Sequence, residues 1–577
     1  MSNIRETLEV KISTALSSVA ELPDSKANVI IASRSEFGDY QANGIMSVAK
    51  QLKSNPRELA QQVVEQLGHD PLIDHYEVAG PGFINIHLSN SWLEQRSKEL
   101  QNSIQSLIPQ VAEPQTIVVD YSSPNLAKEM HVGHLRGTII GDSLVRVLEA
   151  LGHKVIRQNH VGDWGTQFGM LIAYLQSLST DHDIQSTQLA DLEVFYRAAK
   201  ARFDTDPDFA ATARACVVKL QAGDTQILAI WEQFIEESLH HCGAIYEKLN
   251  IKIQPSDLRA ESFYNNRLQG IIDDLNDKNL VTVSDGAKCV FLDQFKGKDG
   301  NPLPVIVQKS DGGFLYATTD LAAIQFRGVE LGAERVLYVV DARQSLHFQQ
   351  IFAVAHEAGF VKETCKLEHI AYGTMMGKDG RPFKTRSGDT IKLVDLLDEA
   401  SRRAFVLVSD KNPDLDNALR QKIAETVGIG AVKYADLSKN RTSDYIFDWD
   451  SMLSFEGNTA PYLLYAYARI KSILRKQEDT SVSSSNIIIT DNAERALIIK
   501  LLQLPEVLQS VAKDYLPSHL STYLYELAGI FMRFYEACPI LKAEPPIKHS
   551  RLLLAEITAN TLKEGLHLLG LETLEQM

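Results

Sequence analysis

The sequence predicts an α/β protein: a doubly wound parallel sheet with an insertion, a small α/β domain before it and an all-α helical bundle after it. Between residues 112 and 390, short runs rich in β-branched residues alternate with stretches of helical periodicity, which is typical of parallel sheets. From about residue 392 to the end, the apolar residues keep a helical spacing. A chain of 577 residues is long enough for several such domains.

The composition fits a globular enzyme, with 44% hydrophobic and 23% charged residues. The net charge of −16 argues against a protein coated with nucleic acid. It leaves room for a large acidic protein that binds phosphates through local Lys and Arg side chains. Charge alone therefore decides little about the partner.

Cysteine usage and the N-terminus bear on the compartment. The cysteines are scattered without a Cys-x-x-Cys pair, so neither a disulfide framework nor a structural zinc site is expected: Cys216, Cys242, Cys289, Cys365 and Cys538. The first residues lead into an amphipathic stretch rather than a signal peptide, and no long uncharged apolar run follows. We therefore expect a cytoplasmic protein that does not enter a membrane.

Residues 1–110 are expected to form an N-terminal α/β domain. Asn55 and Pro56 predict a helix start, with Asn as the cap, Pro in the first position and Glu58 reaching back. The alternation over residues 83–88 predicts a half-buried strand. A module of this size without obvious catalytic groups is more often a binding module than an enzyme.

One stretch of this domain, residues 37–43, suggests contact with nucleic acid. An exposed Tyr40 beside Gln41 and Asn43 could stack on an unpaired base and hydrogen-bond to it. A plain loop before a helix would have the same composition.

The central region opens with a predicted strand at residues 116–120, a loop, and a helix with two histidines, His131 and His134, around its first turn. The apolar face of this helix comprises Ile140, Leu144, Val147, Leu148 and Leu151, and Gly152 stands where a C-terminal cap belongs. The carboxyl end of a parallel strand is where ligands bind, and a helix N-terminus favours phosphate.

Each residue of this His-x-Gly-His motif also has an ordinary structural interpretation. A lone His is usually structural, and two His could hold a metal, although no Cys lies near them. The phosphate interpretation is sharper, because imidazole N–H donors suit the charge of a reacting phosphate. Gly133 would let a flat base approach the backbone closely.

The rest of the central region continues the alternation. A second strand is predicted at residues 154–158, followed by a glycine-rich run at 160–169 that suggests a ligand contact or a tight corner. A largely helical insertion without evident chemistry spans about 175–300. It ends in a hairpin turn at 296–300, between strands at 289–292 and 305–307.

The second half of the sheet carries polar candidates. If a helix begins near Ala317, Tyr316 and Asp320 lie four apart and close together. Strands are predicted at 335–340 and at 369–373. The Gly-rich basic loop at 375–389 would be either a solvated hairpin or, given its place after a strand, a phosphate clamp.

Beyond this loop the chain is expected to be helical, with a connecting region at 391–454 and a bundle at 455–577. The aromatic stripe at 457–470 is interpreted mainly as core. Residues 481–485 are expected to form a polar linker between helices.

The motifs together resemble one enzyme family. His131-Val132-Gly133-His134 after a strand resembles the signature of class I aminoacyl-tRNA synthetases, and the longer run at 122–134 is similar to arginyl-tRNA synthetases. The runs at 37–43, 160–169, 457–470 and 531–539 resemble the same family, in the same order along the chain. The resemblance implies a Rossmann-like catalytic domain at 111–390, an N-terminal domain that touches the corner of the tRNA, and an anticodon-binding bundle at 455–577.

The resemblance also implies the reaction: ATP-dependent activation of L-arginine to arginyl-adenylate, then transfer to the 3′ end of tRNA(Arg). The implied catalytic residues are His131, His134 and Lys128, and ATP would be bound by His131, Gly133, His134, Lys384 and Arg386. The family-wide Lys-Met-Ser-Lys loop is replaced here by Phe383-Lys384-Thr385-Arg386-Ser387-Gly388, a departure that arginyl-tRNA synthetases share. It leaves open which cation does the work of that loop.

Recognition of arginine needs carboxylates in the plane of the guanidinium, which has five donors and a permanent charge. Asp120 and Asp320 match the positions of the family's arginine pocket, with Tyr316 beside them, although Asp120 is shorter than the Glu of many relatives. Asn125 and Gln344 match the positions that hold the α-amino and carboxylate groups.

The expected co-substrate is ATP with Mg²⁺, without zinc, and the expected partners are tRNA(Arg) and L-arginine, bound by a monomer. Two alternatives stay open. A class I ligase for another amino acid, such as cysteine, is disfavoured by the lack of a zinc-type Cys/His set. A tRNA-binding or regulatory protein that has lost catalysis is disfavoured because both histidines and both carboxylates are present.

Overall fold

The computed structural model describes residues 3–100, 108–178, 192–298, 300–383, 391–476 and 486–577. The chain divides into two compact units. The central unit is Glu113–Leu453, and the terminal unit joins Met1–Ala112 to Ser454–Met577. Within the described ranges, no helix combines the length and the apolar character needed to cross a membrane.

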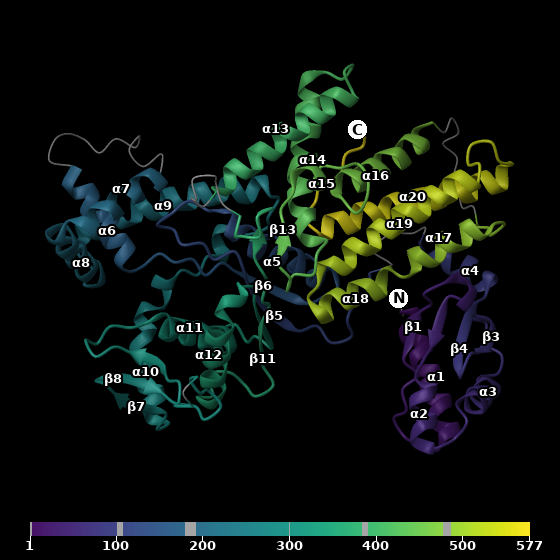
Figure 1. Cartoon of the computed structure of the whole chain (residues 1–577), viewed down its shortest axis with the longest axis horizontal. Coiled ribbons are helices and arrows are strands. Elements are labelled where there is room, and N and C mark those ends of the chain that lie inside the picture. The colour runs from purple at the N-terminus through teal and green to yellow at the C-terminus, as the bar shows by residue number, and fades with distance from the viewer. Residues whose placement is uncertain (1–2, 101–107, 179–191, 299, 384–390, 477–485) are drawn as a thin grey trace. The chain divides into compact units, whose positions relative to one another are not determined.

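The central unit is built on a four-stranded parallel sheet in the order β11-β10-β5-β6. Figure 1 labels three of its strands, β5, β6 and β11. Its strands are β5 (Thr116–Asp120), β6 (Lys154–Gln158), β10 (Arg335–Tyr338) and β11 (Lys366–His369). The first two have the predicted bounds. The chain proceeds outward in opposite directions from β5 and from β10, so the switch point of this sheet lies between their carboxyl ends. Ligands of open α/β sheets bind at such a point.

The strand predicted at 369–373 is wrong in its bounds, because β11 lies earlier. Pairing with β10 defines the strand, and it runs from Arg335 opposite Lys366 to Tyr338 opposite His369. Beyond that, an isolated bridge joins Asp341 to Tyr372. Apolar content alone did not reveal which four residues would find a partner strand.

Helix α5 (Val132–Ala150) follows β5, and its predicted apolar face is buried. The other α-helices of the central unit, outside the insertion, are α6 (Thr166–Leu178), α11 (Tyr316–Gln325), α12 (Ser345–Glu357), α13 (Leu393–Lys411), α14 (Asn417–Leu437) and α15 (Trp449–Met452). A π-helical turn, η6 (Phe326–Glu330), and two 3₁₀ turns, η5 (Glu261–Arg267) and η7 (Ala342–Gln344), carry residues of the site described below.

The insertion contains four helices and a small antiparallel sheet among its described residues. They are α7 (Leu192–Thr205), α8 (Pro207–Gln221), α9 (Thr225–Lys248) and α10 (Leu268–Asp277), followed by β7 (Val281–Ser284), β8 (Ala287–Val290) and β9 (Val305–Gln308). Strands β8 and β9 are antiparallel, which confirms the predicted hairpin. Strand β7 was not predicted.

Two short strands pair where the sequence predicted a loop and a helical region. Strand β12 (Met375–Met376) lies parallel to β13 (Tyr445–Ile446). The expectation that everything after residue 392 is helical is therefore wrong at β13. Two residues are too few to give a periodic signal, and their partner lies 70 positions away.

The N-terminal part of the terminal unit has an antiparallel sheet in the order β1-β2-β4-β3. Its elements are α1 (Ile4–Ala20), β1 (Val29–Ile31), β2 (Tyr40–Ala42), α2 (Ile45–Leu52), α3 (Pro56–Leu67), β3 (Ile73–Ala79), β4 (Phe83–Leu88) and α4 (Asn90–Leu100). Asn55 caps α3 by accepting the backbone N–H of Arg57 at 2.9 Å, as predicted.

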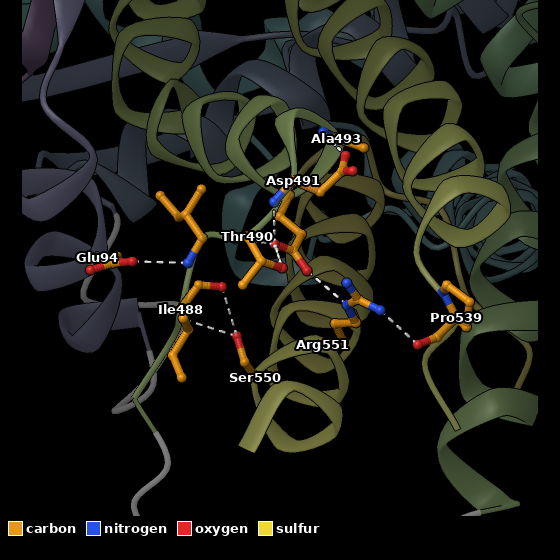
Figure 2. A network of polar contacts seen from close by, with 10 residues as sticks. Glu94, Ile488, Thr490, Asp491, Ala493, Pro539, Ser550 and Arg551 are labelled. Carbon is orange, nitrogen blue, oxygen red and sulfur yellow. Dashed lines mark hydrogen bonds and ion pairs between the residues drawn. The ribbon is translucent and has the colours of Figure 1, made fainter. Parts of the chain in front are cut away.

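The C-terminal part is a helical bundle of α16 (Ala460–Arg475), α17 (Asn492–Leu502), α18 (Leu504–Asp514), α19 (Pro517–Ala537) and α20 (Pro545–Leu568). The linker predicted at 481–485 lies outside the described residues. Figure 2 shows how the start of α17 is fixed. Glu494, which is fully buried, accepts the backbone N–H groups of Thr490 and Asp491 and pairs with Arg551 of α20. Glu94 of α4 accepts the backbone N–H of Ile489 at 2.9 Å, which ties the N-terminal domain to the bundle.

Candidate active site

The two signature histidines form the N-terminal cap of α5. His131 is the N-cap residue, and its Nδ1 accepts the backbone N–H of Gly133 (N···N 3.0 Å). His134 reaches back, and its Nδ1 accepts the backbone N–H of His131 (N···N 3.1 Å). The rings stack with centroids 4.0 Å apart. Because both Nδ1 atoms accept, each neutral ring carries its hydrogen on Nε2.

The surroundings keep both rings neutral. Burial, with a smaller effect of His131, lowers the pKa of His134 to about 3. Burial and the charge of Lys128 lower the pKa of His131. The site therefore offers two uncharged Nε2–H donors at the N-terminus of a helix, beside the switch point of the sheet.

Gly133 has a structural reason that differs from the predicted approach of a base. A Cβ atom at this position would lie 2.8 Å from Cε1 of the His131 ring. The capping geometry of His131 thus excludes a side chain at Gly133. The predicted contact with a nucleotide base stays a prediction.

The loop between β5 and α5 is strained and firmly held. Ser122 and Ser123 have φ values of 74° and 47°, which non-glycine residues rarely adopt. The Ser123 N–H donates to Asn159 Oδ1 at 2.9 Å, and Ser122 Oγ lies 2.8 Å from the Tyr246 hydroxyl. Such strain persists where surrounding contacts fix it, and it is common at functional sites. Asn125, predicted to bind the amino acid, lies in this loop and accepts the N–H of Ala127 at 3.0 Å.

Of the three side chains predicted to bind phosphate, Lys128, Lys384 and Arg386, the structure describes Lys128. The ammonium group of Lys128 lies 4.3 Å from the centroid of the Tyr196 ring of α7. After burial, its charge is the next cause that lowers the pKa of His131. Lys384 and Arg386 lie outside the described residues.

Asp120 is already paired inside the protein. Its Oδ2 accepts from the guanidinium of Arg327 at 2.8 Å, and its Oδ1 accepts the hydroxyl of Ser123 at 3.0 Å. Arg327 is 1% exposed and also donates to Gln158 at 2.6 Å. The carboxylate expected to be available for a substrate guanidinium is thus occupied by an internal one.

Asp320 is more open. Its carboxylate lies on α11, 2.6 Å from Nε2 of His347 and 3.9 Å from Nε2 of His160. Tyr316 begins the same helix and is 75% exposed, and Gln344 is exposed at the end of η7. These contacts gather residues that follow β6 and β10 around Asp320.

Two further carboxylates, which the sequence did not indicate, belong to this group. Burial and the charges of Asp163 and Asp320 raise the pKa of Glu261 to about 7. The Glu261 N–H donates to the carbonyl of Val161 at 3.1 Å, which ties η5 to the loop after β6. Asp163 in that loop accepts the N–H of Ser262 at 2.9 Å. No local sequence pattern points to Glu261, because it lies in the insertion, about a hundred residues from the loop that it contacts.

The N-terminal candidates are placed differently from the prediction. Tyr40 is fully buried, and its hydroxyl contacts Glu506 of α18 at 2.5 Å, so the expectation of an exposed ring is wrong. Gln41 donates to Asn85 at 2.7 Å, and Asn43 Oδ1 is buried. In the part of the chain that the structure describes, no three His, Cys, Asp or Glu side chains could hold a metal ion together.

Comparison with known proteins accounts for most of the chain. The class I (R) tRNA synthetase catalytic domain matches residues 97–449, the DALR anticodon binding domain matches 463–577, and the arginyl tRNA synthetase N-terminal domain matches 6–88. Arginine–tRNA ligases of Laribacter hongkongensis and Marinomonas sp. are 57% and 55% identical over the full length of both chains.

Solved structures of arginyl-tRNA synthetases have a similar fold. The arginyl-tRNA synthetase of Plasmodium falciparum covers the whole chain with a TM-score of 0.87 at 31% identity. That of Thermus thermophilus also covers it, with a TM-score of 0.83 at 26% identity. The fold, the signature helix and the full-length similarity together show that this chain belongs to the arginyl-tRNA synthetase family.

Proposed function

We propose that this chain attaches L-arginine to tRNA(Arg), using ATP. The observation that carries the proposal is the pair of neutral Nε2–H donors of His131 and His134 at the switch point of the sheet. A group of carboxylates also gathers around the loop after β6: Asp163 in that loop, Asp320 on α11 and Glu261 on η5. Neutral donors suit a nucleotide phosphate, and carboxylates suit the guanidinium of arginine.

In the first step, a carboxylate oxygen of arginine attacks the α-phosphorus of ATP, and the bond to pyrophosphate breaks. His131 and His134 would donate hydrogen bonds to the oxygens that gain charge in the transition state. Since the rings start neutral, they stabilise that charge without transferring a proton. Lys128 and the loop carrying Lys384 and Arg386 would hold the remaining phosphates.

In the second step, a hydroxyl of the terminal tRNA ribose attacks the carbonyl carbon of arginyl-adenylate, and AMP leaves. Most of the acceleration would come from positioning and charge stabilisation. Mg²⁺ is expected to accompany ATP, because this ion is usually bound through substrate phosphates. No protein residue is assigned to it.

For arginine recognition, the geometry favours Asp320 and Glu261 over Asp120. A guanidinium that approaches Asp320 would displace His347, which now contacts that carboxylate at 2.6 Å. Glu261 would ionise as the cation binds, because a nearby positive charge favours the carboxylate form. Tyr316, Asn125 and Gln344 keep their proposed roles around the amino acid.

For tRNA recognition, the bundle offers exposed aromatic rings. Tyr465 on α16 is 43% exposed and Tyr525 on α19 is 36% exposed. The Tyr462 and Tyr525 rings meet edge-to-face at 5.5 Å, and the Arg469 guanidinium lies 5.2 Å from the Tyr535 ring centroid. Rings and cations of this kind stack on unpaired bases, so we assign this surface to the anticodon loop.

An aminoacylation assay with each amino acid and total tRNA tests the proposal. We expect charging with arginine alone, on tRNA(Arg), by a cytoplasmic monomer. Charging with cysteine or another amino acid would support the alternative ligase. A folded protein that binds tRNA without charging it would refute catalysis.

A further inference from the structure

Arg136 lies two residues beyond His134 on α5, and its side chain is 2% exposed. Its Nε lies 2.9 Å from Oδ2 of Asp436 on α14, whose side chain is fully buried. A charge so deep in a protein is costly unless it is paired and hydrogen-bonded. The rest of the guanidinium must therefore also find partners.

Its hydrogen-bond acceptors and one of its two aromatic neighbours belong to one segment, residues 441–445. The Arg136 guanidinium donates through Nη1 to the carbonyl of Ser443 at 3.1 Å and through Nη2 to that of Arg441 at 3.3 Å. It also lies 5.1 Å from the ring centroid of Tyr445 and 5.9 Å from that of Tyr372. One side chain of the signature helix thus holds a loop that is about 300 residues away in the sequence.

The held segment in turn carries the start of the basic hairpin, residues 373–383. The carbonyl of Arg441 that accepts from Arg136 also accepts the N–H of Gly373 at 2.9 Å. Thr374 N–H donates to Oδ1 of Asp444 at 2.6 Å, and Met375 pairs with Tyr445 across β12 and β13. The hairpin closes at an isolated bridge between Met376 and Pro382.

Close packing makes this chain of contacts stiff. A Cβ atom on Gly137, next to Arg136, would lie 2.7 Å from the Tyr372 hydroxyl oxygen. A Cβ atom on Gly373 would lie 2.7 Å from Oδ1 of Asp444. With no free space at either junction, a displacement of α5 or of residues 441–445 is passed on to the hairpin.

We propose that Arg136 is a positioning residue that sets the hairpin at 373–383 against the two histidines of the signature helix. This inference rests on the proposed function, in which the basic loop that begins with this hairpin binds the phosphates of ATP. His131 and His134 would act on one part of the nucleotide and the loop on another. A shared anchor at Arg136 would keep the two histidines and the start of that loop, residues 373–383, in one geometry.

The test separates positioning from stability. Arg136→Met leaves Asp436 buried without its partner, so both thermal stability and activity should fall. Arg136→Met combined with Asp436→Asn removes both charges, and most of the thermal stability should return. The carbonyl contacts stay lost, so kcat/KM for ATP should remain reduced by about 10²-fold, the scale of a misplacement of about 1 Å. The KM for arginine should be close to that of the wild type.

Arg136→Lys refines the test. Lysine keeps a positive charge toward Asp436, but a single ammonium group does not reproduce the fork that bridges Ser443 and Arg441. We expect nearly normal stability and a loss in ATP kinetics similar to that of the double variant. All rates are measured as arginine-dependent pyrophosphate exchange at saturating cognate tRNA, per mole of folded enzyme.

The same helix offers a matched control. Arg146 and Asp142 form a second buried pair on α5, with a 2.7 Å contact, and Arg146 also donates to the carbonyl of Asn250. This pair ties α5 to the insertion rather than to the hairpin. Arg146→Met combined with Asp142→Asn should change stability in the same way and leave ATP kinetics unchanged.

A milder variant covers the case in which Arg136 variants do not fold. Asp444 is exposed, and Asp444→Ala removes the acceptor for Thr374 N–H without disturbing the core. It should raise the KM for ATP at unchanged thermal stability. If the double Arg136 variant recovers activity together with stability, or if Asp444→Ala has normal ATP kinetics, the positioning role is refuted.

If the basic loop does not bind the phosphates of ATP, a different result is expected. Lys384→Ala with normal ATP kinetics would show that the loop does not bind phosphate, whatever Arg136 does. Impaired Lys384→Ala beside a fully active Arg136→Met/Asp436→Asn enzyme would leave the phosphate role intact and remove only the positioning.

Discussion

At the scale of single residues, each signature histidine uses one ring nitrogen for the protein and leaves the other for the ligand. Each Nδ1 accepts a backbone N–H at the start of α5. The Nε2–H of each ring is then the donor that remains for a ligand. The sequence predicted donors at a helix start. The fixed tautomer follows from the hydrogen bonds that the Nδ1 atoms accept, and the absence of charge follows from burial, which lowers the pKa of both rings.

This division predicts how His134 variants behave. His134→Ala should slow adenylate formation by about 10²–10³-fold, the usual cost of one lost donor to developing charge. It should also lower stability by about 1 kcal/mol, because a capping contact is lost. Two further variants separate the two nitrogens. His134→Asn, whose amide oxygen mimics Nδ1, should keep the stability of the wild type, and His134→Gln, whose amide nitrogen mimics Nε2, should keep more of the activity. The reverse order would contradict the assigned roles.

The Asp320 carboxylate supports a second prediction. Helix α11 is preceded by Leu315 as its N-cap residue, so Asp320 does not cap it. If the guanidinium of arginine pairs with Asp320, Asp320→Asn should lose about 2–4 kcal/mol in kcat/KM for arginine. The KM for ATP should barely change. Normal arginine kinetics would mean that Asp320 serves the protein alone, through His347.

Glu261 makes arginine binding depend on pH. Its pKa is raised to about 7, so the group is protonated and neutral below that pH and ionised above it. A cationic ligand binds the ionised form, so the KM for arginine should fall as the pH rises from about 6 to about 8, and binding should release protons near pH 7. Glu261→Gln should have a higher KM that is flat across this window. A variant with the pH profile of the wild type would exclude Glu261.

Burial and distant partners change the environment of single residues in ways that local patterns do not show. Tyr40 has the polar neighbours of an exposed ring, yet its partner Glu506 lies 466 positions away. Asp120 has the position of a substrate ligand, yet Arg327 holds it from a π-helical turn that gave no sequence signal. Both partners are distant in sequence, and local patterns do not contain such information.

At the scale of elements, strong local patterns were predicted well. Strands β5 and β6 and the hairpin of β8 and β9 have clear β-branched runs and a glycine-rich turn, and α3 has its cap and its proline. Strands β12 and β13 were missed, because a pair of two-residue strands exists only through its mutual hydrogen bonds. The strand pair that holds the hairpin at 373–383 therefore had no sequence signal.

Arg327 joins the ends of three strands and gives an element-scale prediction. Its guanidinium pairs with Asp120 at the end of β5, donates to Gln158 at the end of β6, and lies 5.0 Å from the Tyr338 ring at the end of β10. Arg327→Met should therefore destabilise the protein by about 3–5 kcal/mol, because Asp120 stays buried and unpaired.

Denaturant unfolding measures this loss, and a second variant assigns its cause. Arg327→Met combined with Asp120→Asn should recover much of the stability. If Asp120→Asn alone instead weakens arginine binding while stability holds, Asp120 is a substrate ligand as the sequence predicted, and the Arg327 pair is secondary.

At the scale of the whole molecule, the terminal unit joins two distant parts of the sequence. Arg495 of α17 makes a bidentate pair with Asp39, at 2.8 and 2.7 Å, and Glu94 and Tyr40 add the contacts to the bundle described above. The N-terminal domain and the bundle therefore form one body. Truncation of the bundle would expose the buried Tyr40, so point variants on the bundle surface are the sharper tool.

Binding of tRNA to the bundle is expected to control the first chemical step. The basic loop lacks the Lys-Met-Ser-Lys pattern of class I synthetases, so we propose that binding of tRNA completes the ATP site, an induced-fit arrangement. Arginine-dependent exchange of pyrophosphate into ATP should then be near background without tRNA. Cognate tRNA should restore it, even when its terminal ribose is oxidised and cannot accept arginine.

Surface variants of the bundle identify the route of this effect. Tyr465→Ala and Tyr525→Ala remove exposed rings proposed to stack on the anticodon loop, and neither ring is part of the ATP site. Each should raise the tRNA concentration needed for half-maximal exchange, by about 1–3 kcal/mol in binding, while exchange at saturating tRNA stays normal. Strong exchange in a nuclease-treated preparation without tRNA would refute the dependence, because the loop would then be formed in the free enzyme. Normal tRNA requirements in both tyrosine variants would instead place the anticodon contact elsewhere on the bundle.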